Sequence, residues 1–187
     1  MTSYALFSTP IGPCGIAWRG GAVVGATLPE GSAEATGRRI ATRSAGQEDE
    51  PPPAIREAMD LIVALLEGEK VDLGAISCDL DGVEPFAQEV YRIARSIAPG
   101  QTTTYGAIAE DLGDKLLARN VGQALGRNPI PIIVPCHRVL GADGKLVGFS
   151  ANGGVALKLR MLAIEGAQPG RAPGLFDDLP LSVKPAP

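Results

Sequence analysis

The apolar pattern of the chain changes near Pro85, and this change restricts the fold more than any other feature of the sequence. Before Pro85 the chain contains short β-like runs separated by Pro and Gly turn residues, and these runs span residues 4–8, 15–19 and 22–28. After it, apolar residues recur at helical spacing, first in a stripe from Phe86 to Ile97. Short strands followed by successive helices predict an α+β fold made of two units.

The first unit covers residues 1–85 and contains further elements besides the three short runs. These elements are expected to be helices at 31–43 and 54–67, a mobile loop at 44–53 and a strand at 75–80. Strands that alternate with helices are typical of a small domain of the α/β or α+β type. The sequence therefore predicts an N-terminal domain that ends at residue 85.

The second unit covers residues 86–166, and two of its helices have capping residues. Thr104 is expected to cap a helix at residues 105–112, and Asp114 a helix from residue 115 to about 126. Two short helices joined by a tight turn have the outline of a helix-turn-helix, although ordinary helical hairpins share it. The other expected elements are extended pieces at 134–140 and 145–149 and a final helix at 155–165.

Charge is distributed unevenly between the two units. The 187 residues include 17 Lys and Arg against 21 Asp and Glu, a net charge of −4. Residues 1–85 hold 6 basic and 13 acidic side chains, whereas residues 86–165 hold 9 and 6. The net charge argues against a nucleic-acid partner, but the second unit by itself is basic enough for weak, salt-sensitive binding. Residues 167–187 hold five prolines and are expected to form a flexible tail.

Simple counts exclude several classes of protein. No apolar run approaches the roughly 20 residues that span a bilayer, and no basic and apolar leader is visible, so we expect no membrane segment and a cytoplasmic location. Three widely spaced cysteines predict reduced thiols, and buried apolar positions are the default for Cys14 and Cys78. One His and no C-x-x-C pair predict that no metal is bound, and we expect no cofactor.

The single His of the chain directly follows a Cys, and this pair is the best candidate for chemistry. A thiolate is a nucleophile, and a nearby base helps to form it at neutral pH. Adjacent residues on an extended strand point to opposite faces, so a water could relay the proton between Cys136 and His137. Pro131 and Pro135 would fix the Cys in one pose. A Cys-His pair by itself is also compatible with a buried structural Cys.

The wider sequence adds a resemblance to a known family. The strings Asn-Pro-Ile-Pro at 128–131 and Pro-Cys-His-Arg-Val at 135–139 resemble the active-site signature of the O6-alkylguanine-DNA alkyltransferase family. The resemblance runs from Phe86 to about Gly166. It implies an N-terminal ribonuclease-H-like domain joined to a C-terminal winged helix-turn-helix domain. It also implies irreversible, single-turnover transfer of the alkyl group from O6-alkylguanine, and from O4-alkylthymine, to the Cys.

The resemblance implies roles for five residues in this transfer. Cys136 would attack the alkyl carbon, His137 would take the thiol proton through water, and Glu165 would hold the His tautomer. Tyr105 would donate a proton or hydrogen bond to the purine ring, and Asn128 would hydrogen-bond the backbone around the Cys. The plain alternatives are a solvated carboxylate for Glu165, a core aromatic for Tyr105 and an ordinary turn residue for Asn128.

The resemblance further implies that the partner is double-stranded DNA containing O6-alkylguanine. The damaged base would be flipped out of the duplex and Arg119 would fill the gap, although a solvated surface Arg is the plain alternative. The family inserts the helix that carries this Arg into the minor groove of DNA. The further DNA contacts that the resemblance implies come from Asn120, Gly122, Gln123 and Arg127. A monomer is the family expectation.

The guanine pocket would be lined by residues near the Cys and before the final helix, namely Pro131, Val139, Phe149 and Ser150. The chain departs from the family pattern at Asn120, Gln123 and Phe149, and in a loop at residues 150–154 that is longer than usual. Two other functions stay open: a lesion-binding protein that recruits other repair without transfer, and a Cys-His hydrolase.

Overall fold

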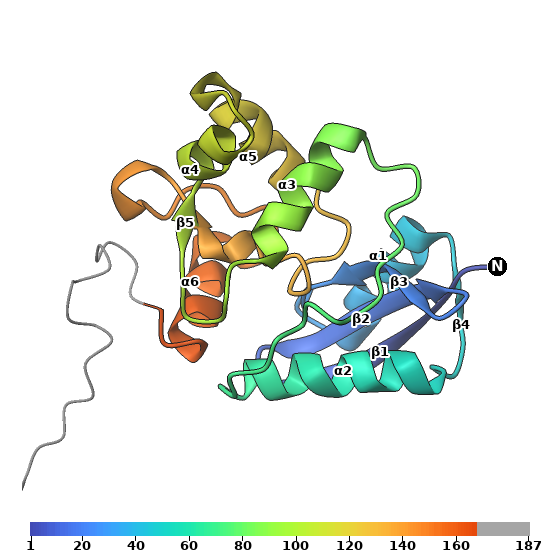
Figure 1. Cartoon of the computed structure of the whole chain (residues 1–187). Helices are drawn as coiled ribbons and strands as arrows, with labels where there is room; N and C mark the ends of the chain where they lie inside the picture. Colours follow the sequence, from blue (N-terminus) through green and yellow to red (C-terminus); the bar gives the residue numbers. More distant parts are fainter. Residues whose placement is uncertain (168–187) are drawn as a thin grey trace, which may run out of the picture.

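A computed structural model of the chain describes residues 1–167. The tail expected at residues 167–187 therefore lies, apart from Ala167, outside the described residues. The described part has a mixed α+β fold in which a sheet with two helices comes first and further helices follow. Figure 1 shows these two groups side by side, the N-terminal group in blue to cyan and the C-terminal group in green to red.

The N-terminal group is built on a four-stranded sheet in the order β3-β2-β1-β4. β1 (Ser3–Thr9), β2 (Gly12–Arg19) and β3 (Ala22–Thr27) form an antiparallel meander, which confirms the three predicted strands. The two-residue β4 (Gln47–Glu48) pairs in parallel with the start of β1. Part of the segment expected to be a loop is therefore a strand.

Helices cover both faces of this sheet. In β2 all residues from Cys14 to Trp18 are buried, which requires cover on both sides because successive side chains alternate between the faces. α1 (Ala33–Ser44) packs Ile40 so close to Gly15 that a Cβ on the glycine would lie 3.0 Å from it. α2 (Pro53–Leu66) lies in front of the sheet in Figure 1 and α1 behind it. Both predicted helices are confirmed.

The strand expected at residues 75–80 is not formed. Within the described residues this segment pairs with the sheet through a single β-bridge between Cys78 and Val23. In it Val23 N donates to Ser77 O at 2.9 Å and Asp79 N donates to Val23 O at 2.8 Å. The Asp79 carboxylate then accepts a hydrogen bond from Asp81 N at 2.9 Å. This local side-chain bond turns the backbone and ends the pairing that the apolar alternation predicted.

The C-terminal group contains the predicted helices. These are α3 (Pro85–Arg95), α4 (Tyr105–Asp111), α5 (Ala118–Gly126) and α6 (Gly154–Ile164). Thr104 Oγ1 accepts a hydrogen bond from Ala107 N at 3.0 Å and Asp114 Oδ1 from Leu116 N at 2.8 Å, so both capping predictions are confirmed. The helix expected from residue 115 begins as a 3₁₀ turn before α5. Among the described residues, no helix is both long and apolar enough to cross a bilayer.

The segment around Cys136 is not extended as predicted. Cys136–Arg138 forms a 3₁₀ turn, and the following strand β6 (Val139–Leu140) pairs in parallel with β5 (Thr103–Thr104) over two residues. Ile132 has a left-handed φ of 77°, and Cys136 N donates a hydrogen bond back to the residue two before it at 2.8 Å. These bends replace the first part of the extended piece expected at residues 134–140, and its last two residues form β6. The piece expected at residues 145–149 forms no strand either.

Candidate active site

The Cys136 thiol lies where two cavities meet. The first, which we call the α4-side cavity, has a volume of about 510 Å³ and is lined by Tyr105, Gly122 and Val147 together with the Cys. The second, the α1-side cavity, has about 160 Å³ and reaches the N-terminal group. Four residues line both cavities with the Cys, namely Leu125, Gly126, Phe149 and Ser150. Cys136, which is partly exposed, therefore lies at the junction of the two cavities.

His137, which directly follows Cys136 in the 3₁₀ turn, forms a buried pair with Glu165. Nε2 of His137 lies 2.8 Å from Oε1 of Glu165, and the two side chains are 1 % and 2 % exposed. Glu165 stands directly after α6, so this helix brings the carboxylate to the 3₁₀ turn. It is not the solvated carboxylate of the plain alternative. Nδ1 of His137 is buried and has no hydrogen-bond partner among residues 1–167.

Arg138 holds the same carboxylate, a role that the sequence analysis missed. Its Nε donates to Oε2 of Glu165 and its Nη2 to Oε1, both at 2.8 Å, and its Nη1 donates to Ile97 O at 2.5 Å. Such a two-pronged pair fixes the carboxylate in position as well as in charge. The available signal was the position of Arg138 directly after the His, although residues 86–165 hold nine basic side chains and the sequence does not single this one out as the partner of Glu165.

The protonation states follow from these contacts. Burial alone would raise the pKa of Glu165, but hydrogen bonds and charge from His137 and Arg138 lower it to about 2. Burial lowers the pKa of His137, and the Glu165 bond offsets this only in part. Burial also raises the pKa of the Cys136 thiol, against hydrogen bonding from Asn128 and the charge of Lys158. At neutral pH the site therefore contains a carboxylate, a neutral imidazole and a thiol.

Asn128 braces the segment that leads to the Cys. Its Nδ2 donates to Val134 O at 2.8 Å, and its Oδ1 accepts a hydrogen bond from Ile130 N at 2.9 Å. The side chain is buried, so these two bonds satisfy it inside the protein. Pro131, expected in the pocket, lies in the same braced segment and lines the α1-side cavity.

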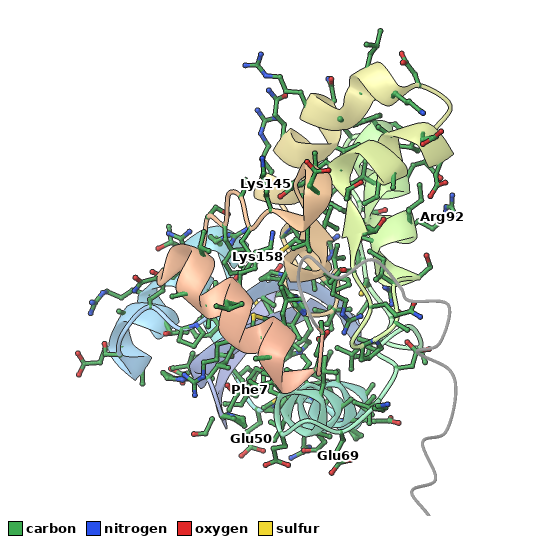
Figure 2. All side chains as sticks on the ribbon, turned by 90° about the vertical axis from the view of Figure 1, so that its left-hand side faces the viewer. Phe7, Glu50, Glu69, Arg92, Lys145 and Lys158 are labelled. Atoms are coloured by element: carbon green, nitrogen blue, oxygen red, sulfur yellow. The ribbon has the colours of Figure 1, made fainter. Side chains whose placement is uncertain are left out.

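Lys158 is the second residue that the sequence analysis missed. It is fully buried on α6, and its Nζ donates to Val139 O at 2.6 Å. The same Nζ lies 5.9 Å from the ring centre of Tyr105 and 6.0 Å from that of Phe149. Figure 2 shows Lys158 among packed side chains, whereas Arg92 projects outward. Val139, expected to line the guanine pocket, lines neither cavity and uses its carbonyl for this bond.

The residues expected to contact DNA divide between two sides of α5. Gly122 faces the site, since a Cβ there would lie 3.8 Å from the Tyr105 ring. Asn120, Gln123 and Arg127 are exposed and line a third cavity of about 340 Å³ between α5 and α3. Arg119 is exposed on the first turn of the helix. The helix thus presents Gly122 to the α4-side cavity and a polar, solvent-facing side to the cavity beside α3.

The fold and the site define a class of α+β protein in which a pair of short helices borders a cavity that holds a thiol beside a buried His-Glu pair. Residues 85–167 match the family model described as the DNA-binding domain of 6-O-methylguanine DNA methyltransferase. Relatives cover more of the chain. The methylated-DNA--protein-cysteine methyltransferase of Mycobacterium tuberculosis is 36 % identical over 177 residues, which cover 95 % of this chain and 100 % of the relative. This chain belongs to the methylated-DNA--protein-cysteine methyltransferase family.

More distant sequences and solved structures agree with this assignment. The relative of that name from Methanothermobacter thermautotrophicus is 33 % identical over 157 residues, which cover 84 % of this chain and 81 % of the relative. The crystal structure of Mycobacterium tuberculosis OGT in complex with DNA has a TM-score of 0.72 and 36 % identity, and the match covers 88 % of this chain and 92 % of that chain. O6-methylguanine-DNA methyltransferase from Pyrococcus kodakaraensis has a TM-score of 0.69 and 25 % identity, with 89 % and 100 % covered.

Proposed function

We propose that the protein repairs DNA by direct reversal of damage, through transfer of the alkyl group of O6-alkylguanine to Cys136. The observation that carries this proposal is that Cys136 lines both cavities and directly precedes His137, whose ring pairs with the buried Glu165, in a chain of this family. The carbon–sulfur bond forms as the carbon–O6 bond breaks, and the purine leaves with the electron pair. The thioether is stable, so each molecule acts once. O4-alkylthymine offers the same kind of carbon and is a second substrate.

The His137 and Glu165 pair supports proton removal from the thiol. Because the Glu165 carboxylate is ionised, it accepts a hydrogen bond from Nε2–H of His137, which leaves Nδ1 as the basic nitrogen. The buried, unpartnered Nδ1 is the atom that would take the thiol proton through a bridging water. Arg138 keeps Glu165 ionised and in place. The carboxylate then stabilises the imidazolium that forms.

The α4-side cavity fits the role of guanine pocket. Tyr105 stands at its wall and would donate a proton or hydrogen bond to the purine ring, which makes guanine a better leaving group. Phe149 and Ser150 complete the rim. Gly122 has no side chain, so the helix leaves space beside the Tyr105 ring for the base to enter. Asn128 holds the Cys136 segment against this cavity.

The exposed side of α5 supports binding to the minor groove of duplex DNA. Arg119 would occupy the space of the extruded base, and Asn120, Gln123 and Arg127 would contact the strands. Such contacts read little sequence, which suits an enzyme that must find a lesion anywhere. The two groups of elements would act as a ribonuclease-H-like domain over residues 1–85 and a winged helix-turn-helix domain over residues 86–166. A monomer in the cytoplasm stays a prediction.

The test uses duplex DNA that carries O6-methylguanine. After incubation the intact mass of the protein is expected to rise by one methyl group, about 14 Da, and Cys136→Ala is expected to show no gain. The competing function is a protein that binds the lesion and recruits other repair. A wild-type protein that binds the modified duplex without a change of mass would establish that function instead.

A further inference from the structure

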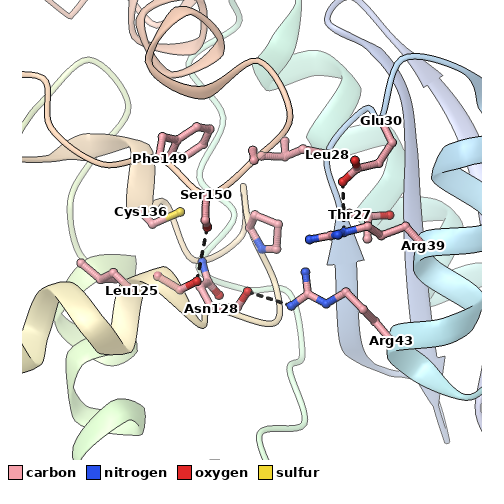
Figure 3. A pocket seen from close by; sticks show the side chains of 13 residues that line it. Thr27, Leu28, Glu30, Arg39, Arg43, Leu125, Asn128, Cys136, Phe149 and Ser150 are labelled. Atoms are coloured by element: carbon pink, nitrogen blue, oxygen red, sulfur yellow. Dashed lines mark hydrogen bonds and ion pairs between the residues drawn. The ribbon is translucent and has the colours of Figure 1, made fainter.

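The wall of the α1-side cavity carries charged side chains that methyl transfer does not need. It lies between the two groups of elements, with Cys136 at one end and Arg39 and Arg43 of α1 at the other. Figure 3 shows both guanidinium groups extending from α1 toward the segment that holds Asn128 and the Cys. The N-terminal group thus reaches to within one small cavity of the nucleophile.

The charges in this cavity are unbalanced. Nε of Arg39 pairs with Oε1 of Glu30 at 3.0 Å. Arg43 donates to Asn128 O at 3.3 Å, and none of the carboxylates in residues 1–167 pairs with it. Burial lowers the pKa of Arg43, and the positive charge of Arg39 lowers it further. Two guanidinium groups therefore face one carboxylate in a partly buried space, which leaves an excess positive charge.

Thr27 also lines the cavity, but its Oγ1 is buried against Gly15, where a Cβ on the glycine would lie 2.7 Å from it. The guanidinium groups of Arg39 and Arg43 are therefore the hydrogen-bond donors considered for a bound group. A wall with this excess of positive charge is suited to an anionic, hydrogen-bond-accepting group.

The geometry of transfer determines which part of the substrate reaches this cavity. In a substitution the sulfur, the attacked carbon and the leaving oxygen lie nearly in line, so further atoms of the alkyl group must extend sideways. The guanine occupies the α4-side cavity, where Tyr105 and Gly122 stand. The second cavity that opens on Cys136 is therefore the space into which a longer alkyl group extends, while a methyl group leaves it empty.

We propose that the α1-side cavity binds the far end of larger O6-alkyl groups and that Arg43, with Arg39, favours those that end in a carboxylate. This inference rests on the proposed alkyl transfer and names a substrate class for it, of which O6-carboxymethylguanine is the simplest member. The sulfur bonds to the methylene carbon, the bond from that carbon to O6 breaks, the purine takes the electron pair and a proton, and the carboxylate is unchanged. A carboxylate next to the reacting carbon repels the thiolate, and the guanidinium offsets this repulsion.

The experiment compares an anionic adduct with a neutral one of the same shape. Single-turnover transfer rates are measured by intact mass on duplexes that carry O6-carboxymethylguanine or O6-carbamoylmethylguanine, with O6-methylguanine as reference. The readout is the ratio of the carboxymethyl rate to the carbamoylmethyl rate. Arg43→Met is expected to lower this ratio about tenfold, since a charge-assisted bond is lost, and Arg43→Lys is expected to retain part of it.

Arg38→Met is the matched control, because Arg38 is an exposed residue of the same helix and does not line the cavity. Its ratio is expected to equal that of the wild type. Because the ratio compares two rates of the same protein sample, it does not depend on the fraction of folded protein. A destabilised variant therefore still gives a valid ratio. Absence of transfer from O6-methylguanine by the wild type would contradict the proposed function itself. Normal methyl transfer with a ratio that Arg43→Met leaves unchanged, or equal slowing on all three duplexes, would overturn the inference about the cavity alone.

Discussion

The sheet around Cys14 and the turn around Cys136 place two thiols of one chain in different surroundings. Cys14 lies in β2 between two helices, 1 % exposed, and burial raises its pKa to about 11. Its polar neighbour is the Thr9 hydroxyl, 3.7 Å from Sγ. Burial raises the pKa of Cys136 as well, but this thiol opens on two cavities and has His137 beside it in the chain. The comparison teaches that burial raises the pKa of both thiols, and that position at a cavity and a neighbouring His distinguish Cys136 as the candidate nucleophile.

The largest effect is expected when the base is removed. Because burial raises the pKa of Cys136, His137→Ala should slow transfer at pH 7 by about 10²- to 10⁴-fold. Its rate should then rise with pH beyond neutrality, since hydroxide replaces the imidazole in forming the thiolate. The measurement is a single-turnover pH profile by intact mass. A His137→Ala variant with the wild-type rate would show that His137 does not act as the base for Cys136.

Removal of the Glu165 side chain should destabilise the protein strongly. Glu165→Ala leaves Arg138 buried without its partner, and we expect the free energy of unfolding to fall by about 3–5 kcal/mol. Urea denaturation measures this loss. The control is Glu110→Ala, which breaks an exposed pair with Lys115 and should cost less than about 1 kcal/mol. Equal losses in the two variants would mean that the buried network contributes no more than a surface pair.

The same network makes stability depend on pH in a defined direction. Folding lowers the pKa of Glu165 from 4.5 to about 2, so its contribution is present above pH 4.5 and is lost as pH falls toward 2. Folding also lowers the pKa of His137 from 6.5, so protonation of the unfolded chain weakens stability below pH 6.5. Urea midpoints should therefore fall from pH 7 to pH 3. In Glu165→Gln the fall between pH 4.5 and pH 3 should be smaller, and an unchanged fall would contradict the assignment.

A smaller effect is expected on the exposed side of α5, which is proposed to contact DNA. Arg119→Ala should slow repair of duplex DNA by about 10- to 100-fold, because the cost of an extruded base is a few kcal/mol. Reaction with free O6-benzylguanine should change little, since it needs no flipping. Arg92→Ala, an exposed change on α3, provides the control. Equal slowing on duplex and free base would remove Arg119 from the flipping step.

The smallest effect on DNA binding is expected from the loss of a single contact to the DNA phosphate backbone. Arg127 is exposed at the end of α5 and is proposed to contact DNA, so Arg127→Ala should weaken binding to any duplex by a similar factor. The slope of log affinity against log salt concentration should fall by about 1, as one phosphate contact is lost. Fluorescence anisotropy at several salt concentrations measures this slope. An unchanged slope would place Arg127 outside the DNA interface.

The sequence predicted the helices and the meander well because their signals are local. Caps such as Thr104 and Asp114 and apolar stripes act within one element, and the structure confirms them. The strand expected at residues 75–80 and the first part of the extended piece expected at 134–140 are wrong, whereas Val139–Leu140 forms β6. Turn bonds at Asp79 and left-handed backbone at Ile132 decide the local path there. Alternation of side chains does not reveal such bends.

The candidate site was predicted in part for the same reason. His137 was singled out by its position next to Cys136 and Glu165 by a family resemblance, and the structure brings the two side chains together at 2.8 Å. Arg138 contacts Glu165 and Lys158 contacts the Val139 carbonyl, and each contact joins two separate elements. A local sequence pattern does not indicate such a partner. The helical spacing of Lys158 with Met161, Leu162 and Glu165 did carry a signal, because it puts the lysine on the buried face of α6. The contribution of α1 to a cavity at the Cys had no sequence signal.

The most direct test of the difference between the two thiols is to locate the transferred group. The protein is incubated with an excess of duplex containing O6-methylguanine and digested, and the peptides that contain Cys14, Cys78 and Cys136 are weighed. We predict one methyl group per molecule, on the Cys136 peptide, with the other two cysteines unmodified. A methyl group on Cys14 or Cys78, or more than one group per molecule, would contradict the account.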